Sequence, residues 1–159
     1  MIELRTLLSR HAQDGRVAWI GIRPKRHDSM VPQSDVHVLQ DGLSGDHARP
    51  GKRAVTLIQA EHLPVIAALI GRQDIAPDIL RRNILVSGLN LSALRGAILS
   101  VGTARLRITT VCAPCSRMET ALGHGGYNAM RGHGGWCAEV VAPGHLSLGD
   151  PVQVVEHAQ

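Results

Sequence analysis

Polar and apolar residues alternate from Arg105 to Val111, and the run is rich in β-branched side chains. Both features are typical of a strand with one buried face. The apolar segment Ile98–Val101 precedes this run, and Gly102 opens the short turn between them. The two segments therefore predict a β-hairpin.

Other short apolar runs, bounded by glycine, proline or short polar residues, predict further strands. They span Val17–Ile22, Val36–Leu39, Lys52–Gln59, Asn83–Val86, Trp136–Val141 and Val152–Val155. From Ala60 the apolar spacing becomes that of a helix, which Gly71 closes. About seven strands with a few short helices predict a mainly β, β-barrel-like fold, α+β by count, in one domain over residues 1–159.

The second strand of the hairpin leads into a loop with two cysteines, Val111–Glu119. Pro114 ends the strand. Ser116, with Glu119 three residues later, has the form of a helix capping box. Cys115 is therefore expected just before a helix N-terminus, where exposed N–H groups and Arg117 favour a thiolate. A thiolate ligates soft metals or attacks sulfur, whereas the alternative is a buried, inert cysteine.

Composition indicates a single globular domain without a membrane helix. At 159 residues and 44% hydrophobic, the chain is long enough for one domain with a substantial core. No apolar run approaches the roughly 18 residues of a membrane helix, and Glu3 and Arg5 stand where a secretory signal would become apolar. We therefore expect a cytoplasmic protein with no membrane partner, whose three cysteines are reduced.

The net charge is +4, and all but Lys25 and Lys52 of the 17 basic residues are arginines. Guanidinium groups suit phosphate and carboxylate, so an anionic small molecule is one expected ligand; a solvated basic surface is the alternative. Nucleic acid is not an expected partner. Phe is absent and Trp19, Tyr127 and Trp136 are the only aromatic residues, which leaves no platform for base stacking.

The cysteines allow three kinds of site. Cys112 and Cys115 form the C-x-x-C of thioredoxin-like redox pairs, but such a pair belongs near the start of a βαβ fold and here follows mostly β signals. The second kind is a zinc site formed by Cys112, Cys115, Cys137 and His145, with His124 or His133 as substitutes. A second C-x-x-C that would make this zinc spacing specific is missing.

The third kind of site is a single working thiol, Cys115, in a pocket lined by arginines and glycine-turn backbone. It requires that Arg81, Asn83, Gly45 and Asp46 lie near Cys115 in space. This interpretation accounts for more of the chain than the other two.

Five short blocks of the chain have a fixed order. They are the G-x-x-G-D-x-h segment Gly42–Ala48, the strand leading to a glutamate Arg53–Glu61, the R-x-N-I block at 81–84, the Pro114-Cys115 loop and the closing G-D-x-V of Gly149–Val152. In this order the blocks resemble those of MOSC domains, the molybdenum cofactor sulfurase C-terminal family. The match spans most of the chain and resembles a small single-domain member.

The resemblance implies a fold that binds the molybdenum cofactor, a pterin dithiolene bearing a phosphate. Cys115 would be the catalytic residue and the ligand to molybdenum. The cofactor-binding positions would be Arg81, Asn83, Gly45, Asp46, His47, Arg53 and Arg117. A thiolate is the soft ligand that such a molybdenum accepts, and arginines with backbone N–H groups bind phosphate. Cys112 and Cys137 are additions to the family's pattern.

Two functions follow from the resemblance. In the first, the protein is a molybdenum-cofactor-dependent oxidoreductase that reduces small N-hydroxylated compounds with electrons from a partner protein. In the second, it is a sulfur carrier or cofactor-binding module with a persulfide on Cys115. A cysteine desulfurase would then be the partner, and pyridoxal phosphate would stay on that partner. We further expect Arg81 and Asn83 to face Cys115, and Arg82 to point to the other face of its strand.

Overall fold

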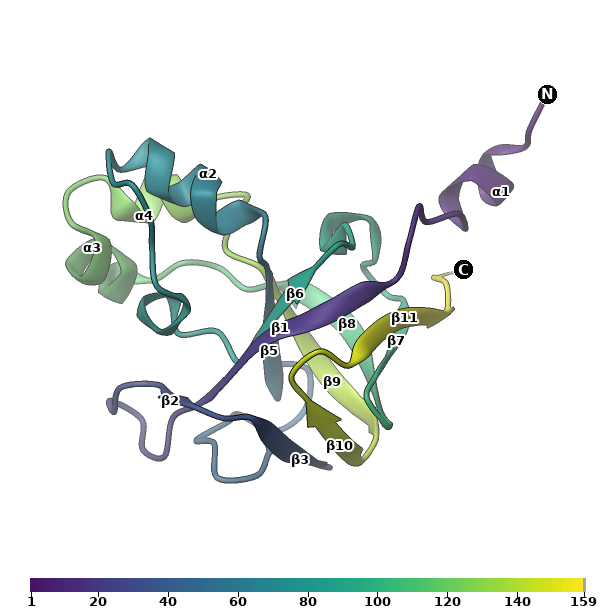
Figure 1. The fold of residues 1–159 in the computed structure, drawn as a ribbon, viewed down its shortest axis with the longest axis horizontal. Helices are drawn as coiled ribbons and strands as arrows, with labels where there is room; N and C mark the ends of the chain where they lie inside the picture. The colour runs from purple at the N-terminus through teal and green to yellow at the C-terminus, as the bar shows by residue number, and fades with distance from the viewer. Residues whose placement is uncertain (159) are drawn as a thin grey trace.

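A computed structural model of the chain describes residues 1–158 (Figure 1). The strands are β1 (Gly15–Ile22), β2 (Val31–Pro32), β3 (Asp35–Leu39), β4 (Gly42–Leu43), β5 (Val55–Gln59), β6 (Ile84–Ser87), β7 (Ile98–Val101), β8 (Ala104–Val111), β9 (Trp136–Ala142), β10 (Gly144–Ser147) and β11 (Pro151–Glu156). The helices are α1 (Leu4–Leu8), α2 (His62–Leu69), α3 (Ser116–Leu122) and α4 (Gly126–Met130), with the 3₁₀ turns η1 (Pro77–Leu80) and η2 (Leu91–Ala93).

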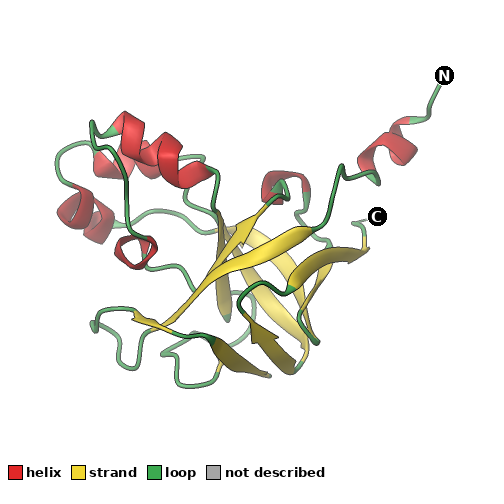
Figure 2. Ribbon diagram, in the orientation of Figure 1, coloured by secondary structure: helices red, strands yellow, loops and turns green. Residues whose placement is uncertain are grey.

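Seven strands close into a barrel in the order β11-β7-β8-β9-β5-β6-β1, and β1 pairs with β11 to complete it. All neighbouring strands run antiparallel except β5 and β6. Parallel neighbours need a crossover connection, and α2 and η1 lie on it. The mainly β, barrel-like fold with a few short helices is therefore confirmed (Figure 2).

The predicted hairpin is the β7–β8 pair, in register from Ile98 opposite Arg107 to Val101 opposite Ala104. The alternation seen in the sequence places its apolar positions inside. Leu106 is fully buried in the barrel core, whereas its neighbours along β8 point outward. Burying each such side chain stabilises the fold by about 1.5 to 3 kcal/mol, which fixes the register of this strand.

A second apolar cluster lies between the helices and the outer face of β5 and β6. Its fully buried members include Ile66 of α2, Leu80 of η1, Met118 of α3 and Met130 of α4. Figure 1 shows α2, α3 and α4 gathered on one side of the barrel, while α1 projects away from it. This layer fixes α3, and with it the cysteine loop, beside one end of the barrel.

Some elements differ from those expected. Gly144–Ser147, where the sequence predicted no strand, is strand β10, which pairs with β3 in a separate three-stranded sheet with β4. Short strands of this kind have no apolar alternation to identify them. The helix α4 was not expected either, because its glycine-rich segment lacks helical propensity. None of the described helices is long and apolar enough to cross a membrane.

Candidate functional site

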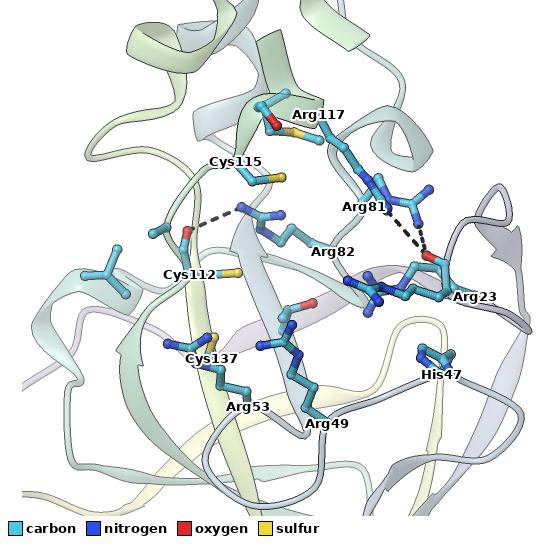
Figure 3. Close-up of a pocket in the computed structure, with 16 residues that line it drawn as sticks. Arg23, His47, Arg49, Arg53, Arg81, Arg82, Cys112, Cys115, Arg117 and Cys137 are labelled. Carbon is cyan, nitrogen blue, oxygen red and sulfur yellow. Dashed lines mark hydrogen bonds between the residues drawn. The ribbon is translucent and has the colours of Figure 1, made fainter. Parts of the chain in front are cut away.

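A cavity of ≈480 Å³ opens at one end of the barrel, beside α3 (Figure 3). It is bounded by the loop after β1, the loop before β5, the turn before β6, the loop after β8 and the start of β9. Seven arginines line it: Arg23, Arg26, Arg49, Arg53, Arg81, Arg82 and Arg117. All three cysteines and His47 line it too.

The positive charge of this cavity is largely uncompensated. No Asp or Glu is among the described residues that line it. Within residues 1–158, Arg23 is the only lining arginine with a carboxylate partner, and its Nε lies 3.8 Å from Oδ1 of the buried Asp46. That buried Nε has no hydrogen-bond partner among the described residues. Such a surplus of guanidinium groups is suited to an anionic ligand.

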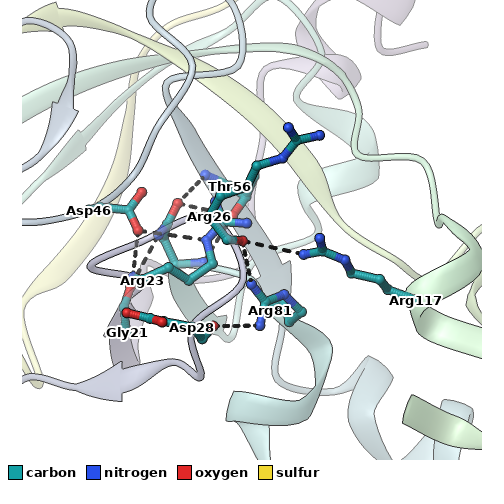
Figure 4. Close-up of polar contacts among 9 residues, drawn as sticks. Gly21, Arg23, Arg26, Asp28, Asp46, Thr56, Arg81 and Arg117 are labelled. Atoms are coloured by element: carbon teal, nitrogen blue, oxygen red, sulfur yellow. Dashed lines mark hydrogen bonds and ion pairs between the residues drawn. The ribbon is translucent and has the colours of Figure 1, made fainter. Parts of the chain in front are cut away.

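One part of the cavity wall, here called the rim, consists of Arg26, Arg81 and Arg117 (Figure 4). Arg81 donates to the carbonyl of Asp28 at 2.8 Å and to that of Arg26 at 3.3 Å. Arg117 donates to the same Arg26 carbonyl at 3.4 Å and contacts Nδ1 of His27. The positive charge of Arg117 is the main cause that lowers the pKa of His27. Because the rim arginines donate to neutral groups, their charge stays available to a ligand.

Arg81 has a backbone conformation that only glycine adopts readily. Its φ is 59°, and within the described part of the chain it is the only residue other than glycine with a positive φ. Burial, followed by the charges of Arg23 and Arg117, lowers the pKa of its guanidinium. A left-handed residue with a side chain costs about 1 kcal/mol or more, and such strain is concentrated at functional sites.

Deeper in the cavity lies the floor, defined by Arg82, Cys112 and Cys137. Arg82 is 7% exposed and donates to three carbonyls: Gly134 at 2.7 Å, Leu80 at 3.0 Å and Cys112 at 3.3 Å. The expectation that Arg82 points away from the cavity was wrong. Strand alternation does not apply to it, because β6 begins only at Ile84 and Arg81 turns the chain into the left-handed region.

The three thiols have different surroundings. Cys115 is exposed at the N-cap of α3, whereas Cys137 is buried. Cys112 lies between these extremes, and a hydrogen bond from the Cys137 thiol lowers its pKa to about 6, with help from the charges of Arg82, Arg23 and Arg53. The same hydrogen bond and burial raise the pKa of Cys137. The reactivity expected of Cys115 stays a prediction, and Cys112 is a second candidate for a reactive thiol.

The start of α3 also differs from the expected capping box. Cys115, not Ser116, is the N-cap residue, and it makes no side-chain capping bond. The Glu119 carboxylate instead accepts the backbone N–H groups of Gly125 at 3.1 Å and Tyr127 at 3.0 Å. These bonds, that of Tyr127 first, lower the pKa of Glu119. The glutamate thus fixes the turn between α3 and α4.

A search against protein families finds that the model of the MOSC domain matches residues 25–153. The chain belongs to the MOSC domain family. A search of curated proteins finds no significant match.

Solved structures share the fold of this MOSC domain at low sequence identity. The YuaD protein of Bacillus subtilis is 19% identical with a TM-score of 0.80, and the match covers 92% of this chain and 98% of that one. YiiM of Escherichia coli is 24% identical with a TM-score of 0.71, over 91% of this chain and 71% of that one. YiiM of Geobacillus stearothermophilus is 21% identical with a TM-score of 0.75, over 89% and 75%.

Five of the residues expected in the site of this MOSC domain do line the cavity: Cys115, Arg81, His47, Arg53 and Arg117. Gly45 and Asp46 are not among the lining residues. Asp46 contacts a lining residue instead. Its Oδ1 accepts a hydrogen bond from the backbone N–H of Arg23 at 2.7 Å and forms an ion pair with the Arg23 guanidinium.

Asn83, expected to hold the cofactor, lies behind the cavity wall and is 1% exposed. Its Oδ1 accepts bonds from the backbone N–H of Thr56 at 3.0 Å and from the Thr56 hydroxyl at 3.1 Å. Its Nδ2 donates to the carbonyl of Gly21 at 3.1 Å. The amide therefore joins β6 to β5 and β1, which secures the turn that carries Arg81 and Arg82.

Several lining residues were not identified from the sequence. Arg23 and Arg26 belong to a stretch that reads only as a basic loop, and Arg49 has no motif around it. Cys112 and Cys137 were considered only as zinc ligands or as a redox motif with Cys115. The signal for Arg23 and Arg26 was the cluster of basic residues around Pro24, which is typical of many solvated loops.

The zinc alternative has no support among residues 1–158, where no group of three or more His, Cys, Asp or Glu side chains could hold a metal ion. His145 lies on β10, with its Nε2 3.3 Å from a carboxylate oxygen of Asp35 and its ring against that of His37. It is not among the residues that line the cavity with the cysteines.

Proposed function

We propose that this MOSC domain binds the molybdenum cofactor in the arginine-lined cavity, with Cys115 as the protein ligand to molybdenum. The observation that supports the proposal is the combination found in one cavity: an exposed thiol, seven arginines and no lining carboxylate among the described residues. The reaction we propose is the reduction of small N-hydroxylated compounds.

The residues present fit such a group. A cavity of ≈480 Å³ is in the size range of small-molecule sites. The phosphate of the cofactor requires donors with positive charge, and Arg81 and Arg117 have no carboxylate partner to displace. The buried, unpartnered Nε of Arg23 is a further donor that an anion would satisfy. A thiolate at Cys115 is the soft ligand that molybdenum accepts.

When bound, the cofactor would supply the redox chemistry, and the protein would supply orientation and access for the substrate. We propose that Arg81 and Arg117 hold the phosphate or pterin, with Arg49 and Arg53 on the opposite wall. Reduction of an N–O bond consumes two electrons and two protons. The imidazole of His47 lines the cavity and is placed to supply a proton, whereas an electron-transfer protein would supply the electrons.

A second function, that of a sulfur carrier, is favoured by the exposure of Cys115 at the N-cap of α3. An exposed thiol can be reached by the persulfide of a partner cysteine desulfurase, which would carry its own pyridoxal phosphate. In that case the arginines would hold the anionic product or the cofactor to which sulfur is delivered.

Elemental analysis separates these two functions. The protein is purified from cells able to make the cofactor, and molybdenum, phosphorus and zinc are measured together with the intact mass. The reductase predicts stoichiometric molybdenum and phosphorus in the wild type, and reduced amounts of both in Cys115→Ser. Protein without molybdenum but with one additional sulfur atom on Cys115 would favour the carrier, and stoichiometric zinc would contradict both.

A further inference from the structure

Two of the cavity's cysteines lie on neighbouring strands. Cys112 directly follows β8, and its backbone N–H donates to the carbonyl of Gly135 at 2.9 Å, which continues the β8–β9 pairing past Val111 opposite Trp136. In this register Cys112 and Cys137 are diagonal neighbours on one face of the ladder. Both side chains line the floor of the cavity (Figure 3), and the thiol of Cys137 is the main cause of the lowered pKa of Cys112.

The surroundings give the two thiols opposite protonation states. Cys137 is 4% exposed and its raised pKa keeps it a thiol, while Cys112, with a pKa lowered to about 6, is a thiolate at neutral pH. The Cys112 carbonyl is held by Arg82 Nη2 at 3.3 Å, so its backbone is fixed on both sides. A fixed thiolate that opens to a cavity and has a second thiol as its diagonal neighbour is the arrangement of a nucleophile with a resolving partner.

We propose that Cys112 and Cys137 form a redox pair that reduces a hydroperoxide and closes to a disulfide on the floor of the cavity. This activity does not involve the molybdenum cofactor and goes beyond the proposed function. Cys115, which we assign to the cofactor, takes no part in it.

The reaction has two steps, formation of a sulfenic acid and closure of the disulfide. The Cys112 thiolate attacks one oxygen of the peroxide, an S–O bond forms, the O–O bond breaks, and the departing oxygen takes a proton to leave as water or an alcohol. The sulfur of Cys137 then attacks the sulfenic sulfur of Cys112, an S–S bond forms, the S–O bond breaks, and a second water leaves with the proton of Cys137. The two thiols supply the two electrons that the peroxide accepts, and a dithiol reductant would restore them.

The arginines of the cavity favour the first step. Negative charge develops on the departing oxygen, and the guanidinium groups of Arg82 and Arg53, whose charges act on Cys112, stabilise it. Cys112 opens further to the cavity than the buried Cys137, so the peroxide reaches it first. Cys137 is the resolving thiol because it is the diagonal neighbour of Cys112 on the ladder and lines the same cavity floor.

The test uses fully reduced protein exposed to hydrogen peroxide, followed by alkylation and peptide mapping by mass spectrometry. We expect a Cys112–Cys137 disulfide in the wild type and in the matched control Cys115→Ser. In Cys137→Ala, where no resolving thiol remains, a sulfenic acid should be trapped on Cys112 by a 1,3-dione reagent. In Cys112→Ser, Cys137 should stay unmodified.

The rate gives a quantitative expectation. At pH 6.5 Cys112, with a pKa of about 6, is mostly ionised, whereas free cysteine, with a pKa of about 8.5, is about 1% ionised. The lower nucleophilicity of the less basic thiolate offsets most of that gain, so Cys112 should react roughly fivefold faster than free cysteine.

A Cys112–Cys115 disulfide, or no disulfide in a wild type that melts cooperatively, would overturn the proposal. So would first oxidation at Cys137. Each of these results is obtained without the cofactor, so none of them bears on whether molybdenum binds.

Discussion

The rim and the floor of the cavity both contain arginine side chains, but these differ in burial and in the groups to which they donate hydrogen bonds. On the rim, Arg81 donates to two carbonyls of a surface loop in a partly exposed setting. On the floor, the adjacent Arg82 is buried and joins three segments of chain through three carbonyls. The two neighbouring arginines therefore differ in role. Arg81 is accessible to a ligand, whereas Arg82 stabilises the structure of the cavity.

This difference predicts that substitutions in the floor lower stability, while substitutions in the rim lower binding and leave the fold intact. The carbonyl of Gly134 accepts a hydrogen bond from Arg82, and that of Gly135 accepts one from the backbone N–H of Cys112, so both carbonyls stabilise the floor. The largest effects are therefore expected there.

The largest loss of stability is expected for Gly135→Ala. Gly135 has a φ of 90°, and a Cβ there would meet the carbonyl oxygen of Leu57 at an impossible separation. Since that oxygen is backbone, β5 would have to shift, at a cost of about 3 to 4 kcal/mol in unfolding free energy. Chemical denaturation monitored by circular dichroism measures it.

Gly132→Ala is the matched control, because Gly132 also has a positive φ, of 81°, but no atom within 4 Å of its Cβ position. It should cost only about 1 kcal/mol. Equal losses in the two variants would show that conformation alone, and not the close approach to β5, makes Gly135 necessary.

Arg82→Ala should cost about 2 to 3 kcal/mol, because it leaves three buried or half-buried carbonyls without their donor. Thermal melting should show the loss, and bound pterin should fall with it. Arg131→Ala is the surface control, since Arg131 is exposed. A variant that melts like the wild type would remove the distinction between floor and rim.

Arg81→Ala should leave the melting temperature nearly unchanged but reduce cofactor retention. A charge-assisted contact to phosphate is worth about 1.5 to 3 kcal/mol, so affinity should fall roughly tenfold to a hundredfold. Alanine has the same left-handed strain as arginine, whereas Arg81→Gly would relieve it and should be at least as stable as the wild type. Undiminished pterin in both variants would exclude Arg81 from the site.

The smallest effect is a shift in the pH dependence of alkylation at Cys112. Because its pKa is lowered to about 6, the thiolate fraction, and the rate with iodoacetamide, should rise with pH and reach half its maximum near pH 6. Cys137→Ala removes the hydrogen bond that is the main cause of the lowering, so the midpoint should move to higher pH. An unchanged midpoint would assign the lowering to the arginines instead.

The barrel was predictable from the sequence because burial of one strand face leaves an alternation that can be read directly, as along β8. The cavity was only partly predictable. Arg81 and Cys115 belong to local motifs, but Arg23 and Arg49 reach the cavity from loops whose sequences contain no periodic signal. The orientation of Arg82 depends on a single left-handed residue before it, which no strand pattern reveals.

The central claim, that Cys115 binds molybdenum in the arginine-lined cavity, is tested most directly by X-ray absorption at the molybdenum edge. Wild-type protein loaded with cofactor should show one more sulfur neighbour of molybdenum than Cys115→Ser, and Cys112→Ser should match the wild type. Equal sulfur counts in the wild type and Cys115→Ser, or a sulfur lost in Cys112→Ser, would contradict the assignment.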